Sequence, residues 1–534
     1  MILYDYILKN GNIIDGNNND CYIADIGIVN DSIKSIGILS ECDAKNTIYA
    51  SGKFITPGFI DAHSHGDLNL FDVYAKNQLL QGITTEITGQ CGEGISPNNG
   101  KIKYIAAIEG NNFEQKIKIQ EINEKSKTYK GFFEYLQSNK FGVNILPQVG
   151  HGAIHNTAMG NSSDIPNREQ MNKMIDLLGE AMENGAIGMS AGLIYPPGSY
   201  TGKEELIELC KIVSKYKGRY STHLRSEGDM VIEAVKEAIE IAEKTGVRLI
   251  ISHHKVSGKN NWGKSVETLK LIDDAIKRGV DIWLDQYPYT AGATVLSAII
   301  PTEFIRAGND NVLKNLEDRI YRGEIKKFIE SNRSSGEIIL NSAGGFSGVI
   351  VAKYEENPEY VGKTIESLSL NLQKDPYDIL FDIIQKSNGQ AMAVYNLMDE
   401  KDVIRIMKYN RTTFGTDATH STYANPFGHP RAFGTFPTLI KKYVLEKNIL
   451  TLEEMVYKAS GLTAKVAKLK NRGLIKEGYR ADINIIDLKK LRINSSYENP
   501  NGNNLGFDYV FVNGQIAVKD DTYNGVLAGK TLSV

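Results

Sequence analysis

The middle of the chain repeats one rhythm, an apolar strand followed by an amphipathic helix, and this rhythm limits the possible folds. In the clearest unit, a strand at 220–225 precedes a helix at 227–245, whose small and apolar residues recur at helical spacing up to Gly246. Eight β/α units favour a closed parallel barrel over an open sheet. The eight predicted strands are 54–65, 84–90, 144–150, 186–193, 220–225, 247–253, 281–287 and 412–417.

The two chain ends follow a different pattern, with short alternating strands separated by Asn- and Gly-rich turns. Neither end is long enough to form a good sheet alone, so we expect one small β-sandwich built from residues 1–57 and 471–534. The α/β class follows, with a (β/α)8 TIM-like barrel over 58–470. The stretch between strands seven and eight is too long for one connection and predicts a lid-like insertion at about 290–411.

Composition excludes several classes of protein. The 534 residues are 41% hydrophobic and 23% charged, with a net charge of -3, so no basic excess indicates a nucleic acid or membrane partner. The first ten residues lack a basic start, and we find no long apolar run, so we expect neither a signal peptide nor a membrane span. The four cysteines form no CxxC pair or disulfide pattern, which favours a cytoplasmic location.

Metal-binding residue types gather where the predicted strands end. The chain has nine histidines, and four of them lie at such ends, together with one cysteine and one aspartate. In a β/α barrel these ends share one face, which is where active sites form. Imidazole, thiolate and carboxylate groups together suit a divalent metal such as zinc. The candidates are His63, His65, Cys91, His223, His253 and Asp417.

Single members of this set have plainer explanations. Cys91 alone is more often a small buried apolar side chain, and His223 alone could be a hydrogen-bonded core histidine. Asp417 could cap the following segment. Because adjacent residues of a strand point to opposite faces, at most one of His253 and His254 should reach the barrel axis. The grouping is therefore stronger evidence than any member.

Several motifs resemble those of one family, the D-aminoacylases (N-acyl-D-amino-acid deacylases) of the amidohydrolase superfamily. The resemblance covers essentially the whole chain in order, and the segment at 429–437 is its most specific part. The motifs are H-S-H, G-Q-C-G, T-H-L-R, S-H-H-K, D-Q-Y-P-Y-T-A-G, H-P-R-A-F-G-T-F-P and R-G-L-I-K-E-G-Y-R-A-D.

The resemblance implies zinc-dependent hydrolysis of N-acyl-D-amino acids, small molecules that carry a free carboxylate. It implies one zinc ion held by Cys91, His223 and His253, and a second, weaker position formed by His63 and His65 that shares Cys91. Asp417 would be the general base and then the general acid. Substrate-binding roles fall to Arg431 and Lys255 for the carboxylate, with Tyr195 and Tyr289 as further candidates.

Three positions depart from the family pattern. Asp417 stands in F-G-T-D-A-T-H, where a glycine more commonly follows the aspartate; His155 stands where an arginine is usual, and Ala293 where a serine often contacts substrate. None removes a predicted ligand. All three could change which acyl-D-amino acid fits.

Two other functions remain open at this stage. A cyclic amidase of the dihydroorotase or hydantoinase kind shares the barrel and the H-x-H pair, but it normally bridges two metals through a lysine on strand four. Strand four here, at 186–193, has no lysine, whereas the Cys91 thiolate could bridge instead. A non-catalytic barrel that serves as a scaffold would typically have lost metal ligands. The oligomeric state is not indicated by any pattern.

Overall fold

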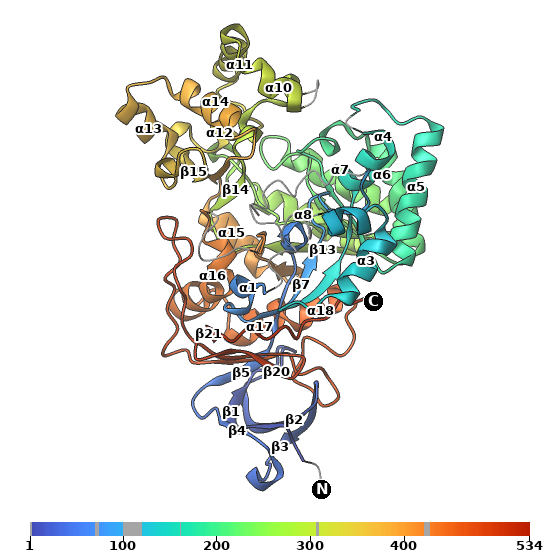
Figure 1. Ribbon diagram of the computed structural model, residues 1–534, viewed down its shortest axis with the longest axis vertical. Coiled ribbons are helices and arrows are strands. Elements are labelled where there is room, and N and C mark those ends of the chain that lie inside the picture. Colours follow the sequence, from blue (N-terminus) through green and yellow to red (C-terminus); the bar gives the residue numbers. More distant parts are fainter. Residues whose placement is uncertain (1–2, 70–73, 100–119, 161, 306–308, 421–427) are drawn as a thin grey trace.

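The computed structural model describes residues 3–69, 74–99, 120–160, 162–305, 309–420 and 428–534. A β/α barrel forms its centre, a nine-stranded sheet lies below the barrel, and a small helical region with its own sheet lies above it (Figure 1). The boundaries at 57/58 and 470/471 stay predictions.

The barrel strands run parallel in two hydrogen-bonded sets, β6-β7-β8 and β9-β10-β11-β12-β13-β17. β8 and β9 are consecutive parts of one barrel strand, and the Ala62 amide closes the ring by donating to the Phe414 carbonyl at 3.0 Å. The predicted eight-stranded barrel is therefore confirmed. Its strands are Phe59–Asp61 (β6), Ile83–Thr88 (β7), Asn144–Pro147 (β8), Val149–Gly150 (β9), Gly188–Gly192 (β10), Arg219–His223 (β11), Arg248–Ile251 (β12), Ile282–Gln286 (β13) and Thr412–Phe414 (β17).

The predicted first strand, 54–65, is wrong as one element. The chain leaves the small sheet at the end of β5 (Phe54–Pro57), turns at Gly58 and enters the barrel as β6. A Cβ atom at Gly58 would lie 2.2 Å from the Thr84 hydroxyl oxygen, so only glycine fits where the two regions join. An unbroken apolar run does not show that the strand changes sheets.

Amphipathic helices cover the barrel, and their ends follow local capping chemistry. A capping box of Thr451 and Glu454 opens α17, which ends at Ala459, and α18 follows after a break at Ser460. The helix predicted from Glu227 begins only at Val231 and ends, as expected, before the left-handed Gly246. These helices are α1 (Lys76–Leu79), α3 (Tyr129–Ser138), α4 (His151–Met159), α5 (Arg168–Glu183), α6 (Lys203–Lys215), α7 (Val231–Thr245), α8 (Ser265–Lys277), α15 (Glu400–Lys408), α16 (Arg431–Thr438), α17 (Leu452–Ala459) and α18 (Gly461–Val466).

Strands from both ends of the chain share the nine-stranded sheet, in the order β21-β20-β19-β18-β5-β1-β2-β3, with β4 also paired to β1. Ile33 donates to the Tyr479 carbonyl and Ala481 to that of Asp31, so the β2–β3 end curls back over an isoleucine-rich core. Its strands are Tyr6–Ile13 (β1), Tyr22–Val29 (β2), Ser32–Gly37 (β3), Thr47–Tyr49 (β4), Phe54–Pro57 (β5), Ile483–Ile486 (β18), Phe507–Val512 (β19), Gln515–Lys519 (β20) and Thr522–Tyr523 (β21).

The insertion between β13 and β17 contains a three-stranded antiparallel sheet and a group of helices at the top of Figure 1. α15, the last helix before β17, packs against α8 of the barrel, and the predicted bounds of about 290–411 stay a prediction. The elements are β14 (Ala291–Val295), β15 (Val349–Lys353), β16 (Met392–Asn396), α9 (Thr302–Ile305), α10 (Asn309–Asn315), α11 (Arg319–Ser331), α12 (Ile339–Ser342), α13 (Ile365–Leu372) and α14 (Pro376–Lys386).

Candidate metal centre and catalytic pocket

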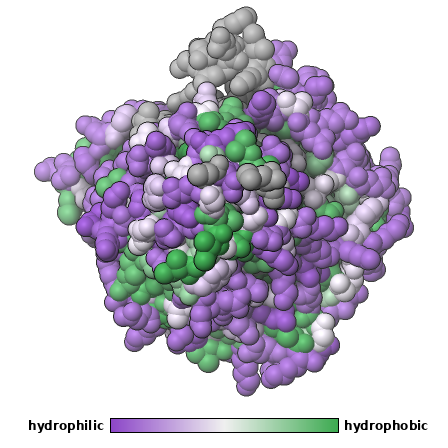
Figure 2. Space-filling view, turned by 90° about the horizontal axis from the view of Figure 1, so that it is seen from below, coloured by the Kyte–Doolittle hydropathy of each residue, from purple (hydrophilic) through white to green (hydrophobic). Residues whose placement is uncertain are grey.

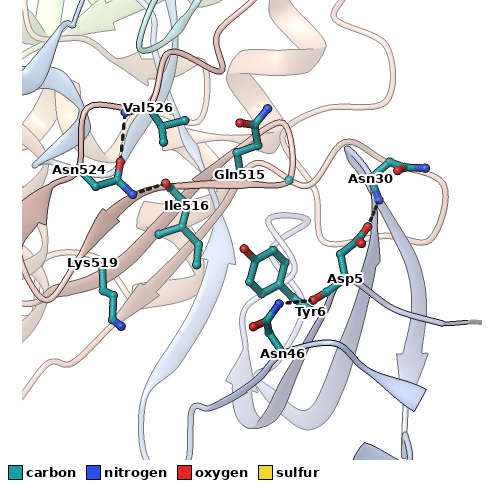
Figure 3. Close-up of a pocket in the computed structure, with 10 residues that line it drawn as sticks. Asp5, Tyr6, Asn30, Asn46, Gln515, Ile516, Lys519, Asn524 and Val526 are labelled. Atoms are coloured by element: carbon teal, nitrogen blue, oxygen red, sulfur yellow. Dashed lines mark hydrogen bonds between the residues drawn. The ribbon is translucent and has the colours of Figure 1, made fainter. Parts of the chain in front are cut away.

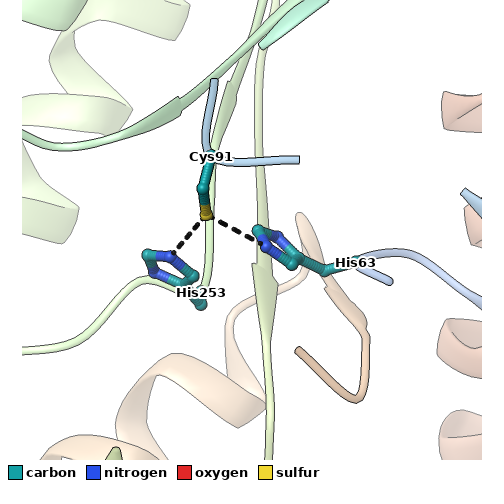
Figure 4. Close-up of side chains that lie close together, drawn as sticks. All are labelled: His63, Cys91 and His253. Atoms are coloured by element: carbon teal, nitrogen blue, oxygen red, sulfur yellow. Dashed lines mark hydrogen bonds between the residues drawn. The ribbon is translucent and has the colours of Figure 1, made fainter. Parts of the chain in front are cut away.

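The Cys91 thiol lies among three imidazoles at the carboxyl end of the barrel strands. Its sulfur is 3.4 Å from His63 Nε2, 3.3 Å from His253 Nε2 and 3.9 Å from His223 Nδ1, and all four side chains are buried. Figure 4 shows the His63 and His253 rings turned toward the sulfur from opposite sides. The structure thus brings together four of the five predicted metal ligands around one point.

Backbone conformation places several of these groups. Cys91, His253 and Asp417 adopt left-handed φ angles of 54°, 34° and 52°, a region that non-glycine residues seldom occupy. Each follows the end of its barrel strand by two or three residues, so the left-handed turn directs the side chain back over the barrel mouth. Such conformations cluster at functional sites because the surrounding fold holds them in place.

Asp285, near the end of β13, holds two of the imidazole-bearing segments. Its Oδ1 atom lies 3.0 Å from His63 Nδ1 and accepts a 2.6 Å hydrogen bond from the backbone amide of His253. A carboxylate on Nδ1 leaves the Nε2 lone pair of His63 facing Cys91, which is how metal-binding histidines are commonly oriented.

Asp417 occupies the opposite side of the cluster. Its Oδ1 lies 3.2 Å from His65 Nε2 and 3.6 Å from His63 Nε2, while Oδ2 accepts a 2.7 Å hydrogen bond from Arg431. Burial alone would raise the pKa of Asp417, but the Arg431 charge and the nearby histidines hold that pKa well below its usual range. The carboxyl group is therefore an anion at neutral pH and can accept a proton.

Glu227 joins the remaining histidines to a lysine. Its Oε1 lies 2.6 Å from Lys255 Nζ, 3.2 Å from His253 Nδ1 and 3.6 Å from His223 Nε2. Burial tends to raise the pKa of Glu227, but Lys255 and the two histidines outweigh this effect and lower it. The ion pair keeps both charges buried beside the cluster.

The donor set fits a zinc ion. Three groups of side chains present ligand atoms within 4.8 Å of one another: His63, Cys91 and His253; His63, His65 and Asp417; and His223, Glu227 and His253. Buried His223 Nε2 makes no hydrogen bond within the described part of the chain, with Glu227 3.6 Å away. Burial also raises the pKa of the Cys91 thiol, so an uncompensated thiolate would be costly there without a cation.

In the predicted second metal position, His63 and His65 share Cys91, and the structure brings only His63 of this pair next to Cys91. Cys91 lies beside His63, as expected, but His65 turns toward Asp417 and toward Glu93, whose carboxylate is 3.6 Å from His65 Nδ1. His254, as predicted, faces away and contacts the Thr268 hydroxyl of α8 at 2.9 Å. Which donors take part in binding a metal stays a prediction.

The predicted substrate-binding residues fall into two groups. Arg431 and Lys255 both lie over the ring of Tyr287, at 5.0 and 5.6 Å, so two cations face one side of the cluster. The Tyr195 ring packs against His223, and its hydroxyl contacts the Thr294 hydroxyl at 3.1 Å. Tyr289 instead points to Thr438 and His429, and the structure does not bring it to the cluster.

The structure also locates two of the residues that depart from the family pattern, Ala293 and His155. The backbone carbonyl of Ala293, on β14, accepts a 3.1 Å hydrogen bond from Arg431, so the insertion directly borders the pocket. His155 is buried on α4, one turn from His151. A small cavity next to Cys91 is lined by His151, Glu93 and Tyr195 along with glycines and prolines.

Sequence reasoning missed Glu227, Asp285 and Tyr287. Asp285 and Tyr287 stand within the D-Q-Y-P-Y-T-A-G motif, and their position at a strand end was the signal that could have identified them. Glu227 follows His223 by four residues but lies in a turn before α7, where its charge resembles that of an ordinary surface loop.

A larger depression lies far from this site, in the nine-stranded sheet. It has a volume of about 550 Å³ and is lined by strand and turn residues of both chain ends (Figure 3). Its Asp5 carboxylate already accepts hydrogen bonds from the Asn30 amide and from Lys45. Its lining includes Lys519 but neither histidine nor cysteine, unlike that of the barrel mouth.

Comparison with known proteins connects this geometry with a family. A model of the amidohydrolase family matches residues 46–307 and 398–518. The chain is 31% identical to a D-aminoacylase of Alcaligenes xylosoxydans xylosoxydans over 99% of this chain and 98% of that protein. It is 29% identical to an N-acyl-D-glutamate deacylase of the same organism, over 96% of this chain and 93% of the relative.

Solved structures agree with this result. A crystal structure of D-aminoacylase has a TM-score of 0.81 and 31% identity, covering 99% of this chain and all of the other. An N-acyl-D-glutamate deacylase from Bordetella bronchiseptica, solved with zinc and a phosphonate inhibitor, has a TM-score of 0.80 at 27% identity, with 99% and 100% coverage. A D-hydantoinase from Thermus shares the fold, with a TM-score of 0.55 at 16% identity. Within the described residues, no helix is both long and apolar enough to span a membrane.

Proposed function

The chain belongs to the amidohydrolase family, and on this basis we propose that it is a zinc-dependent N-acyl-D-amino-acid deacylase, which releases a carboxylate and a free D-amino acid. The observation that carries the proposal is the joint placement of the Cys91 cluster and the Asp417–Arg431 pair at one barrel mouth. The first group suits a metal, and the second offers a proton acceptor beside a fixed cation. Preference for the D form rests on the relatives.

Cys91, His223 and His253 would hold the zinc ion, with His63 and His65 at its outer side. Bound zinc would supply a Lewis acid for the amide carbonyl and would lower the pKa of a coordinated water toward about 7. The described strand four, β10, presents Gly188–Gly192 without a lysine, so the Cys91 thiolate is the candidate bridging ligand if a second metal binds.

Asp417 would take the proton from the attacking water and return it to the leaving amine. Its Oδ1 faces His63 and His65, where the water would lie, while Arg431 fixes its other oxygen. Protonation of the amine matters because an unprotonated amine is a poor leaving group. The anionic state of Asp417 at neutral pH is the form that the first step needs.

Arg431 and Lys255 would bind the substrate carboxylate. Both cations face the Tyr287 ring, although each is already paired with a carboxylate of the protein, Asp417 or Glu227. A planar guanidinium can hold two carboxylates through its two edges. Tyr195, whose ring packs against His223, would donate to the substrate carbonyl or carboxylate.

The two alternative functions are less well supported. The cyclic amidases among the comparisons, the hydantoinases, share only the fold at 14–16% identity. A scaffold without catalysis would have no need for five buried ligand-type side chains at one barrel mouth. A cytoplasmic location rests on the cysteine pattern and stays a prediction.

A hydrolysis screen tests the proposal. The purified protein, loaded with zinc, is incubated with matched N-acetyl-D- and N-acetyl-L-amino acids and with hydantoin and dihydropyrimidine rings, and amine release is measured. We expect turnover of several D-amino acid derivatives and little of their L forms. Turnover of the rings alone, or of L forms at equal rates, would refute the proposal.

A further inference from the structure

Glu86 is a buried carboxylate that the proposed chemistry does not use. It lies on β7, with no exposed surface, below the barrel mouth. One oxygen accepts a 2.7 Å hydrogen bond from the Ser64 hydroxyl, and the other lies 2.8 Å from His420 Nε2. Ser64 and His420 are equally buried. Ser64 lies between His63 and His65, and His420 follows Asp417 by three residues, so Glu86 connects the two loops that carry these site residues.

The same two loops are joined by their backbones. The Asp417 amide donates to the His63 carbonyl at 2.8 Å, and the His65 amide donates to the Ala418 carbonyl at 2.9 Å, which makes Ser64 and Ala418 a short parallel bridge. The Ser64 hydroxyl also accepts a 3.0 Å hydrogen bond from the Gly66 amide. The distance between Asp417 and the histidines therefore depends on this junction.

Asp61 connects the same two loops through further hydrogen bonds. Its Oδ1 accepts hydrogen bonds from the amides of His63 and Thr416, at 3.1 and 2.9 Å, and its Oδ2 accepts one from the Thr416 hydroxyl at 2.6 Å. Both carboxylates therefore bind across the seam where the first and last barrel strands meet.

Burying these polar side chains at the junction costs free energy that apolar packing would avoid. Asp61 and Glu86 are paired in register on neighbouring strands, and burial, with Glu86 beside it, raises the pKa of Asp61 to about 8. A Cβ atom at Gly66 would lie 2.6 Å from Glu86 Oε1 and from His420 Nε2, so the polar pair also restricts this loop to glycine. An apolar pair at the same place would fill the space without these costs.

We propose that Ser64, Glu86 and His420 form a brace that positions Asp417 against His63 and His65. Glu86 is a positioning residue, since it touches neither the metal ligands nor the expected substrate position. In one respect the brace rests on the proposed function, because its effect on turnover assumes that Asp417 transfers the proton. Its effect on the geometry of the junction does not depend on that assumption.

Ser64→Ala tests the brace with a small change. The substitution removes one hydroxyl and its bonds to Glu86 and the Gly66 amide. Ser265→Ala is the matched control, because Ser265 is also fully buried and also donates to a buried carboxylate, Asp402, but lies on α8 away from the mouth. Both variants should lose similar stability, so any further effect of Ser64→Ala is specific to the junction.

Two readouts are compared in zinc-loaded protein. We expect Ser64→Ala to lower kcat by about tenfold with KM within about twofold, because small misplacement of a catalytic group reduces turnover strongly. Amide hydrogen exchange in 63–66 and 415–418 should become about tenfold faster, since opening of the junction becomes easier. Zinc content should be unchanged. Ser265→Ala should match the wild type in kcat, in zinc content and in exchange at these segments.

The second variant, Glu86→Gln, keeps the size of the side chain and can satisfy only one of the two partners. It should show the same pattern as Ser64→Ala. His420→Gln should keep part of the junction, because its side-chain amide can still donate a hydrogen bond to Glu86. Wild-type kcat and exchange in both Ser64→Ala and Glu86→Gln would overturn the brace. An inactive wild type would refute the proposed function alone, and the exchange data would still decide on the brace.

Discussion

Two buried polar clusters occupy opposite ends of the barrel, and they differ in how completely their groups are paired. At the floor, where the nine-stranded sheet meets the barrel, Arg472 pairs with Asp482 and donates to Asn513 at 2.7 Å. Asn513 in turn donates to Asp482 through its backbone and to Asn144 of β8 at 2.8 Å. Every charge there has an opposite partner.

The cluster at the mouth is built differently. Cys91 and three histidines converge there, and His223 Nε2 makes no hydrogen bond within the described residues. Three residues of this end have left-handed backbones. Burial and polarity are common to both ends, so neither identifies a functional site. Left-handed backbones occur at both ends, since Asn513 of the floor has a φ of 48°. Incomplete pairing distinguishes the mouth from the floor, and the following substitutions test that distinction.

The largest effect is expected from Cys91→Ala. Removing the central donor should abolish zinc binding and lower kcat/KM by at least about 10⁴-fold, because the metal supplies several kcal/mol of stabilisation to the transition state. Zinc content and amine release measure the outcome. Cys210→Ala, which removes a buried cysteine on α6, should keep both at wild-type values. Full activity in Cys91→Ala would show that the cluster at the mouth is not a catalytic metal site.

Asp417→Asn should separate metal binding from proton transfer. The amide keeps the shape and can still accept from Arg431, but it cannot take a proton, so kcat should fall by about 10²–10⁴-fold while zinc remains bound. Steady-state kinetics and metal analysis on the same sample provide the measurement. A kcat near the wild-type value would show that another group transfers the proton.

Arg431→Gln should act mainly on substrate recognition. The guanidinium faces Tyr287 and the mouth, so its loss should raise KM for N-acetyl-D-amino acids by about 10–100-fold. Because Arg431 also contacts Asp417, the informative quantity is the ratio of kcat/KM for the acid to that for its carboxamide. The ratio should collapse toward one in Arg431→Gln and stay high in Arg411→Gln, a change at the cation stacked on Trp283.

Asp482→Asn should show the opposite pattern at the floor. Removing one partner of a buried ion pair leaves the Arg472 charge uncompensated and should cost about 3–5 kcal/mol in the free energy of unfolding. Chemical denaturation measures this cost. Activity per folded molecule should match the wild type, and a specific loss of kcat without a loss of stability would show that the floor has a catalytic role.

A smaller effect is expected from His155, buried on α4 near the mouth. Burial, helped by neighbouring His151, lowers the pKa of His155 to about 4, so the unfolded chain binds this proton more readily. The stability due to neutral His155 is therefore complete above about pH 6.5 and is lost as the pH falls toward 4. Between pH 7 and 5 the loss is about 2 kcal/mol. His155→Gln should reduce the difference between denaturation curves at these two pH values; an unchanged difference would contradict the shift.

The sequence predicted the barrel well because eight strand–helix units follow one another along the chain. His63, Cys91, His223, His253 and Asp417 marked five strand ends correctly, and the left-handed turns that aim three of them were not visible in the pattern. The apolar run at 54–65 failed as a guide because hydrophobicity does not reveal a change of sheet.

The supporting carboxylates of the site were harder to find. Asp61, Glu86, Glu227 and Asp285 act through partners that lie far away in the sequence, such as Thr416 for Asp61 and His420 for Glu86. No local spacing reports such contacts, because they depend on the closure of the barrel. Tyr289 is the opposite case. Its place in a motif suggested a substrate-binding role, but its hydroxyl contacts Thr438 of α16 instead of the cluster.

The most direct test of the account is a zinc titration of metal-free protein, followed by hydrolysis of an N-acetyl-D-amino acid and its L enantiomer. The account predicts that activity rises from near zero to a plateau at about one equivalent of zinc and is confined to the D form. Activity that is independent of zinc, or no hydrolysis of any N-acyl-D-amino acid at saturating zinc, would contradict it.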